Sequence, residues 1–206
     1  MKAQFITVEG LEGVGKTTQA EVLCHWLESR SIPYIRTREP GGTEIAEHIR
    51  TVVLSHHEEK MDPMTELLLV FAARQQHVEA KIKPALRAGK WVVSDRFTDA
   101  TYAYQGGGRQ LDKATIRELE LFVLKDFQPD LTLWFDCDAE LGLSRARARG
   151  ELDRIETEAI DFFNRCRSAY AERQAENTLR FIRLDASATI DEVSKHLISE
   201  LENRYG

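Results

Sequence analysis

The chain has 206 residues, of which 42% are hydrophobic and 30% charged, a balance typical of a globular protein of one domain. Its formal net charge of −6 argues against non-specific binding to nucleic-acid polymers or anionic membranes, and the sequence has no apolar run of membrane-spanning length. Because the three cysteines are widely spaced and the first residues enter a strand directly, we expect a cytoplasmic protein without zinc or disulfides.

The chain opens with a predicted strand, Gln4–Val8, a glycine-rich turn and a helix, Thr17–Ser29. Glycines let the backbone aim several N–H groups inward, and the start of a helix directs its positive dipole end at the same point. A lysine and a hydroxyl at the end of the turn suit the β- and γ-phosphates and Mg²⁺. The turn therefore predicts a P-loop for a nucleoside triphosphate, formed by Gly10, Leu11, Glu12, Gly13, Val14, Gly15, Lys16, Thr17 and Thr18.

Strands and helices alternate along the rest of the chain. Further strands are predicted at Pro33–Arg38, Trp91–Asp95, Leu131–Asp136 and Leu179–Asp185. Further helices are predicted at Thr43–Leu54, Pro63–Ala88, Asp112–Phe127, Ala139–Arg149, Ile155–Ala175 and Ile190–Arg204, with a glycine-rich loop at Gln105–Gly108. This order predicts an α/β fold with a five-stranded parallel sheet, helices on both faces and ligands at the carboxyl ends of the strands.

Charged residues follow two of these strands. Asp95 ends a hydrophobic strand, where it could hold Mg²⁺ through water, and the adjacent Arg96 would tolerate that cation if an acceptor phosphate lay between them. Arg38 and Arg50 could add positive charge at the same place, although either arginine alone is more often a surface residue.

A basic cluster, Arg145–Arg154, spans a helix end and a glycine break. The composition of this segment favours a mobile lid, residues 145–156, that brings arginines to a transferring phosphoryl group. The alternative is a solvated helix end whose charges complement the helix dipole, and for Arg145 alone we prefer that alternative.

Phe71 and Arg74 are three residues apart on the long predicted helix and share a face. An aromatic ring beside a guanidinium suits a flat heterocycle, which the ring stacks on and the guanidinium hydrogen-bonds. Taken without context, Phe71 is more often a core residue and Arg74 a surface residue.

Several of these segments together resemble thymidylate kinase, in order and spacing, over nearly the whole chain. They are Gly10–Thr18, Thr37–Thr43, Phe71–His77, Asp95–Phe97, Tyr104–Gly106 and Arg147–Glu156. The resemblance implies a P-loop kinase fold that transfers the γ-phosphate of ATP to dTMP with Mg²⁺, giving dTDP and ADP, usually as a homodimer. P-loop positions 11–14 carry no arginine, which is similar to the bacterial type, in which the lid supplies the catalytic charge.

The resemblance also implies roles for single residues. Phe71 would stack on thymine, Arg74 would donate to its O4, and Thr101 and Gln105 would help to fix the base. Tyr104 would pack against the deoxyribose and Glu12 would accept from the 3′-hydroxyl. The acceptor phosphate would be held by Arg38 and Arg96, to which we add Arg50 for its charge. Mg²⁺ would be held by Thr17 and Asp95, and catalysis would depend on Lys16, Arg96, Arg147, Arg149 and Arg154.

Two other functions stay open. One is a different nucleoside-monophosphate kinase of the same fold, and the other is a P-loop regulatory ATPase that acts on a protein partner. The absence of an Asn-Lys-x-Asp motif disfavours the second. For a two-fold contact, the helix Pro63–Ala88 and the apolar part of Leu111–Phe127 are the two options.

Overall fold

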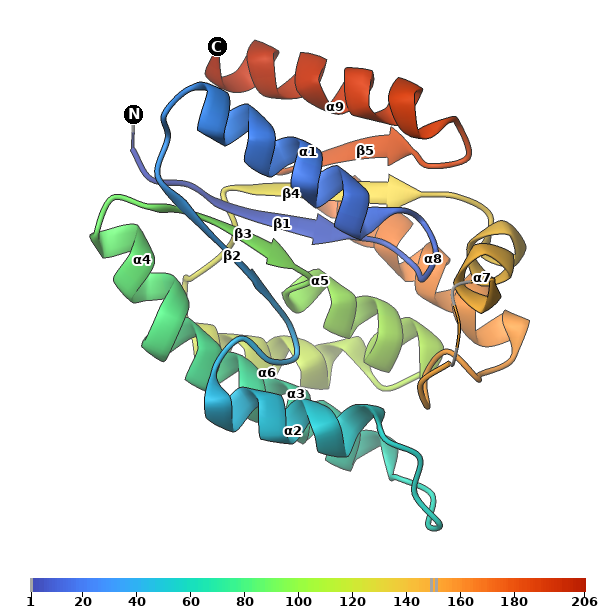
Figure 1. The fold of residues 1–206 in the computed structure, drawn as a ribbon. Coiled ribbons are helices and arrows are strands. Elements are labelled where there is room, and N and C mark those ends of the chain that lie inside the picture. The colour runs from blue at the N-terminus through green and yellow to red at the C-terminus, as the bar shows by residue number, and fades with distance from the viewer. Residues whose placement is uncertain (1, 149, 151) are drawn as a thin grey trace.

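A five-stranded sheet forms the centre of the molecule, for which a computed structural model describes residues 2–148, 150 and 152–206 (Figure 1). The strands run in the order β2-β3-β1-β4-β5 and every pair is parallel, with Phe5 opposite Val92 and Ile6 opposite Leu131. The α/β fold predicted from the sequence is therefore confirmed. The bounds are β1 (Phe5–Glu9), β2 (Tyr34–Arg38), β3 (Trp91–Asp95), β4 (Leu131–Asp136) and β5 (Phe181–Asp185).

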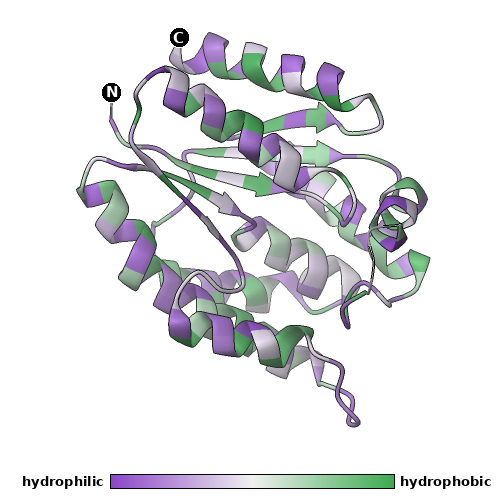
Figure 2. Ribbon diagram, in the orientation of Figure 1, coloured by the Kyte–Doolittle hydropathy of each residue, from purple (hydrophilic) through white to green (hydrophobic). Residues whose placement is uncertain are grey.

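Helices cover both faces of this sheet (Figure 1). They are α1 (Lys16–Ser29), α2 (Glu44–Leu54), α3 (Pro63–His77), α4 (Lys83–Arg87), α5 (Thr98–Thr101), α6 (Lys113–Leu124), α7 (Ala139–Arg147), α8 (Ile160–Glu176) and α9 (Ile190–Tyr205), with π-helices η1 (Val78–Ile82) and η2 (Tyr102–Gly108). On one face α1 and α9 lie side by side, and on the other α8 packs against η2. Hydrophobic residues concentrate in β1 and β4, whereas the 55–62 connection is hydrophilic (Figure 2). No helix in the described part of the chain is long and apolar enough to cross a membrane.

The predicted helix Pro63–Ala88 is one helical stretch with a π-helical turn inside it. It begins where expected, because the Asp62 carboxylate accepts hydrogen bonds from the backbone N–H groups of Met64 and Thr65. The wider turn η1 ends two residues before Pro84, which has no N–H to donate to the preceding turn.

The predicted glycine-rich loop at Gln105–Gly108 is wrong, since these residues belong to η2. A side chain at Gly107 would place its Cβ 2.6 Å from the carbonyl oxygen of Arg165, and one at Gly108 would meet the ring of Phe162. Both neighbours lie on α8. The glycines therefore allow two helices to approach closely and do not mark a turn.

The helix predicted from Ile155 begins five residues later, at Ile160. The Asp153 carboxylate accepts from the backbone N–H groups of Ile155 and Glu156, at 2.8 and 2.9 Å. These bonds close a local turn that competes with helix formation. Arg149, the predicted end of the preceding helix, lies outside the described residues.

Candidate active site

The P-loop lies between the end of β1 and the start of α1. Gly10, Gly13 and Gly15 have φ angles of 140°, 71° and 85°, which L side chains rarely adopt. A Cβ at Gly13 would also collide with the carbonyl of Gly142 on α7. Among the described residues no side chain caps the first turn of α1, so its N–H groups are available to an anion.

The Lys16 ammonium lies inside this loop, where its Nζ donates to the carbonyls of Gly10 and Leu11 at 3.1 and 2.6 Å. Burial, followed by the nearby charge of Arg96, lowers the pKa of Lys16 to about 8, although Asp95 and Glu12 act in the opposite direction. Lys16 is thus a buried cation that the loop carbonyls position before a phosphate binds.

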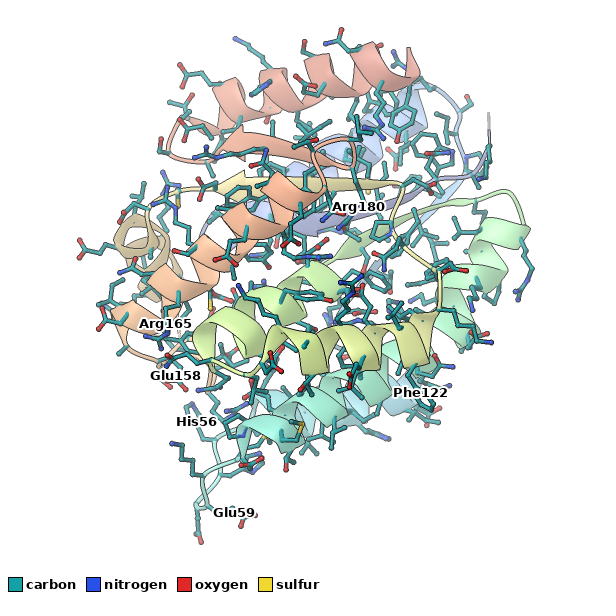
Figure 3. All side chains as sticks on the ribbon, turned by 180° about the vertical axis from the view of Figure 1, so that it is seen from behind. His56, Glu59, Phe122, Glu158, Arg165 and Arg180 are labelled. Atoms are coloured by element: carbon teal, nitrogen blue, oxygen red, sulfur yellow. The ribbon has the colours of Figure 1, made fainter. Side chains whose placement is uncertain are left out.

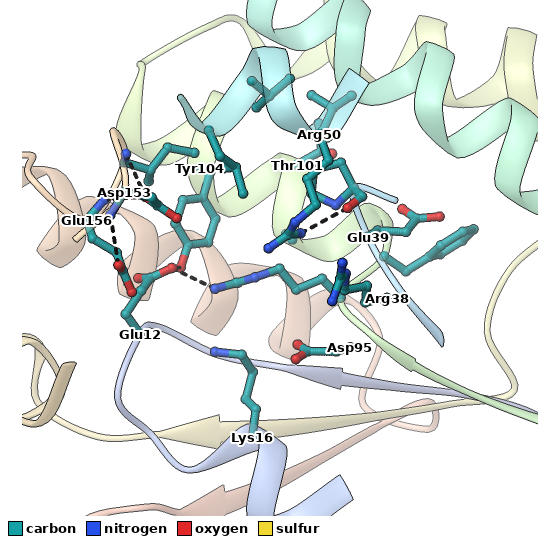
Figure 4. Close-up of a pocket in the computed structure, with 18 of the residues that line it drawn as sticks. Glu12, Lys16, Arg38, Glu39, Arg50, Asp95, Thr101, Tyr104, Asp153 and Glu156 are labelled. Carbon is teal, nitrogen blue, oxygen red and sulfur yellow. Dashed lines mark hydrogen bonds and ion pairs between the residues drawn. The ribbon is translucent and has the colours of Figure 1, made fainter. Parts of the chain in front are cut away.

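A cavity of about 520 Å³ opens beside the P-loop, a volume in the usual range for small-molecule sites (Figure 4). In Figure 4 Lys16 and Asp95 lie on the P-loop side, and Arg50 and Thr101 lie on the opposite side. The predicted residues that line it are Glu12, Gly13, Gly15, Lys16, Thr17, Thr18, Arg38, Arg50, Arg74, Asp95, Arg96, Thr101, Tyr104 and Gln105. The residues predicted to bind the nucleoside triphosphate and those predicted to bind the phosphate acceptor therefore line one cavity, at the carboxyl ends of the strands.

Arg96 connects the two sides of the cavity. Its guanidinium donates to the Glu12 carboxylate at 2.7 Å and to the carbonyl of Gly10 at 2.9 Å. The Tyr104 hydroxyl donates to the same carboxylate at 2.7 Å. Arg96 itself has a φ of 72°, a strained conformation for a residue with a side chain, and such strain is frequent at functional sites.

The Asp95 side chain has an oxygen without a partner. Its Oδ1 atom is buried and receives no hydrogen bond from the described residues. A buried carboxylate oxygen is costly to leave unpaired, which fits a cation held here when nucleotide binds. The described residues contain no group of three or more His, Cys, Asp or Glu able to enclose a metal, and Thr17 lines the same cavity as Asp95.

Arg74 lies at the far end of the cavity and is almost completely buried. Its Nε donates to Glu39 at 2.7 Å, its Nη1 to the Thr101 hydroxyl at 2.9 Å and its Nη2 to the carbonyl of Phe97 at 3.1 Å. Since each Nη carries a second N–H, two donors remain for a ligand. The expectation that Arg74, taken without context, is a surface residue is therefore wrong.

Phe71 does not lie where its predicted stacking role requires. Its buried ring packs with Leu67, Tyr102 and Ile116 and is not part of the cavity wall. Val70 lines the cavity in its place, four residues before Arg74 and on the same face of α3. The spacing of three residues thus identifies a side chain outside the cavity wall, whereas a spacing of four identifies Val70, which lines it.

The predicted lid arginines lie in different places. Arg145 is exposed in the last turn of α7, as expected for a solvated helix end, and it also lines the cavity and donates to the carbonyl of Ala186 at 2.7 Å. Arg147 is exposed and is not among the lining residues, and Arg149 lies outside the described part. Arg154 is also not among the lining residues, and its Nη2 donates to the buried Glu66 at 2.5 Å.

Arg38 and Arg50 form the outer edge of the cavity. Arg38 is paired with Glu47 at 2.9 Å, and Arg50 donates to the carbonyl of Pro40 at 2.9 Å. Burial and the neighbouring charge of Arg38 lower the pKa of Arg50 below its usual range. Both guanidinium groups therefore lie where a bound anion would be stabilised by their positive charge.

The chain is similar to known proteins over nearly its whole length. The family profile described as Thymidylate kinase matches residues 8–197. A thymidylate kinase of Teredinibacter turnerae is 50% identical over 202 residues, covering 98% of each chain, and one of Pseudomonas fluorescens SBW25 is 53% identical over 195 residues, covering 95% of this chain and 93% of the relative. The crystal structure of a thymidylate kinase from Ehrlichia chaffeensis superposes with a TM-score of 0.78 at 31% identity and covers 98% of this chain and 99% of that one.

Proposed function

The chain belongs to the thymidylate kinase family, and we propose a role for each group of its site in the reaction of that family, the transfer of the γ-phosphate of ATP to dTMP. The products are dTDP and ADP, a step in dTTP synthesis. The observation that supports these roles best is the single cavity shared by the P-loop, Arg96 and the buried Arg74.

The P-loop residues bind the phosphates of ATP, with Lys16 as the cation for the β- and γ-phosphates. Thr17 and Asp95 are the residues that would hold Mg²⁺, which fits the unpaired oxygen of Asp95. Bound Mg²⁺ would neutralise charge on the phosphates. We further propose a cytoplasmic location, which the three unpaired, buried cysteines support.

The acceptor dTMP occupies the far end of the cavity. Arg96, Arg38 and Arg50 hold its phosphate, and Arg74 with Thr101 and Gln105 binds the base. The phosphate has a second pKa of about 6, so it is mostly a dianion at neutral pH and needs no general base. Catalysis is then a matter of aligning two anions and neutralising their charge.

A lid formed by residues 145–156 completes the site in our proposal, within a single kinase domain of residues 1–206. Arg145 already lines the cavity, and Arg147 and Arg149 follow it on the segment that would close. Closure would exclude water and bring positive charge to the transferring group.

A homodimer is also part of the proposal. Exposed apolar side chains gather on α2, α3 and α6, which pack next to one another, and Phe122 on α6 is 83% exposed (Figure 3). Exposed apolar patches of this kind are typical of subunit contacts. The residues are Ile45, Val52, Met64, Leu68, Leu121 and Phe122.

The substrate assignment is tested by ADP release with dTMP, dUMP, dCMP, AMP and UMP as acceptors. We expect dTMP to give the highest kcat/KM. A preference for AMP or UMP would support another nucleoside-monophosphate kinase. ADP release without any acceptor, at the rate seen with dTMP, would support a regulatory ATPase.

The activity with limiting ATP is expected to fall at alkaline pH. The protonated Lys16 binds phosphate, and its pKa of about 8 places the loss of that charge just above neutrality. The profile of kcat/KM for ATP reports the free enzyme and should decline as pH rises through about 8. At saturating ATP the bound phosphates stabilise the charge, so kcat should decline at higher pH. The variant Lys16→Arg stays charged throughout, and an unchanged alkaline decline in it would contradict the assignment.

A second test concerns the wall of the base site. Val70→Ala is expected to raise the KM for dTMP about 5–10-fold, because it removes apolar contact area worth about 0.8 kcal/mol per methylene. Phe71→Leu is the matched control, which should lower the melting temperature but change KM less than twofold. Steady-state kinetics and thermal melts measure both. A larger KM effect in Phe71→Leu than in Val70→Ala would restore the stacking role for Phe71.

A further inference from the structure

Glu66 is a buried carboxylate that the phosphoryl transfer does not use. It lies on α3 and is 1% exposed. Its Oε1 accepts from Gln105 Nε2 at 2.7 Å, and its Oε2 accepts from Arg109 Nη2 at 3.2 Å and Arg154 Nη2 at 2.5 Å. Burial acts to raise the pKa of Glu66, but the hydrogen bond from Gln105 and the two guanidinium groups outweigh it and hold that pKa below its ordinary value. Glu66 is therefore ionised at neutral pH.

The ionised carboxylate fixes the orientation of the Gln105 amide. A carboxylate can only accept hydrogen bonds, so Gln105 must present its NH₂ group to Glu66. The carbonyl Oε1 of Gln105 receives no hydrogen bond from any side chain or backbone group that the structure describes. Since Gln105 lines the cavity, the carbonyl is the part of the amide left to face a ligand.

A fixed carbonyl distinguishes between pyrimidines. Thymine carries an N–H at N3, which can donate to a carbonyl oxygen. Cytosine has a lone pair at N3, which would face the same oxygen with no proton between them. A site built to hydrogen-bond one partner rejects an analogue that leaves its buried polar groups unpaired.

Arg154 and Arg109 are the two cations whose guanidinium groups donate to the Glu66 carboxylate. Arg154 is anchored by its Nε to the carbonyl of Val53 at 2.9 Å and by its backbone N–H to the carbonyl of Leu54 at 3.1 Å. Arg109 has a second carboxylate partner, Glu158, whereas the hydrogen bond that the structure describes for the Gln105 amide goes to Glu66. Glu66 therefore contacts both arginines and also Gln105, which lines the cavity.

We infer that Glu66 is a positioning residue for base selectivity: it holds Gln105 with its carbonyl oxygen toward the base, so that the site accepts an N3–H and rejects an N3 lone pair. The inference rests on the proposed function, in which Gln105 contacts the base. It assigns to Arg154 a role in neutralising Glu66, in place of the catalytic role predicted from the sequence.

The test is the ratio of kcat/KM for dTMP to kcat/KM for dCMP. Glu66→Gln can donate or accept, so it no longer fixes the Gln105 amide, and we expect this ratio to fall about tenfold. A merely structural role would lower both kcat/KM values together and leave the ratio unchanged. In a Gln105→Met background, where no amide remains to orient, Glu66→Gln should not change the ratio further.

Two more variants make the result decisive. Glu158→Gln removes the other carboxylate beside Arg109 and should leave the ratio within twofold of the wild type. If Glu66→Gln alone does not fold, Glu66→Gln with Arg154→Gln removes one charge of each sign and should show the same tenfold loss. An unchanged ratio in the folded variants, or an equal loss in the Gln105→Met background, would overturn the inference. A wild-type enzyme without preference for dTMP would instead overturn the proposed base site.

Discussion

Replacing Arg149 by alanine is expected to lower kcat by about 10³, with much smaller changes in KM for ATP and dTMP. The reaction brings two anions together, and P-loop positions 11–14 supply no arginine to offset that charge. Arg149 follows the cavity-lining Arg145 by four residues in the sequence. A charge that acts mainly on the transition state affects kcat more than substrate binding. Steady-state ADP release at saturating substrates measures the effect.

The neighbouring arginines provide controls for this expectation. Arg147 is exposed and lies outside the cavity wall, so Arg147→Ala should lower kcat only a few-fold. Arg154→Ala should instead destabilise the fold, by about 3 kcal/mol, because it removes a partner of the buried Glu66. If neither Arg147→Ala nor Arg149→Ala lowers kcat by more than a few-fold, the lid does not supply the catalytic charge.

The fold could be predicted from the sequence because local signals agree with the tertiary structure over most of the chain. Three of the strands, β1, β3 and β4, are short and almost completely buried runs, and capping residues such as Thr43, Asp62 and Asp112 mark helix starts that the structure confirms. The failures have a different origin. Gly107 serves contact with a helix more than fifty residues away, which local sequence does not reveal. The turn at Asp153 depends on a side-chain bond that competes with a helical pattern.

The candidate site divides in the same way. Asp95 and six of the nine predicted P-loop residues line the cavity, because a strand end or a motif fixes their position; Gly10, Leu11 and Val14 do not line it. Residues on helices are harder, since a shift of one position turns a side chain by about 100° and decides between Val70 and Phe71. The catalytic role predicted for Arg154 rests on its place in a basic cluster. The buried carboxylate that binds it, Glu66, lies 88 positions away in the sequence, so the local pattern does not reveal this pair.

Arg96 is expected to be the most sensitive residue on the acceptor side. Arg96→Ala should lower kcat/KM for dTMP by about 10³, since it removes a charged donor from a preorganised site. The same change removes the 2.7 Å hydrogen bond from the Arg96 guanidinium to the Glu12 carboxylate. The negative charge of Glu12 is then no longer paired with Arg96 and lies beside the incoming phosphate. The loss should therefore be larger for dTMP than for ATP. The measurement is kcat/KM for each substrate with the other saturating.

The left-handed backbone at Arg96 allows its charge to be separated from its conformation. At a φ of 72°, alanine retains the strain that arginine has, whereas glycine adopts this conformation freely. Arg96→Gly should thus be more stable than Arg96→Ala by about 1 kcal/mol, and yet both should lose the same 10³ in kcat/KM. Added guanidinium should restore part of the activity to each variant, because the missing group is the cation. Recovery of activity in Arg96→Gly without guanidinium would show that the left-handed backbone conformation, and not the charge, is what Arg96 contributes.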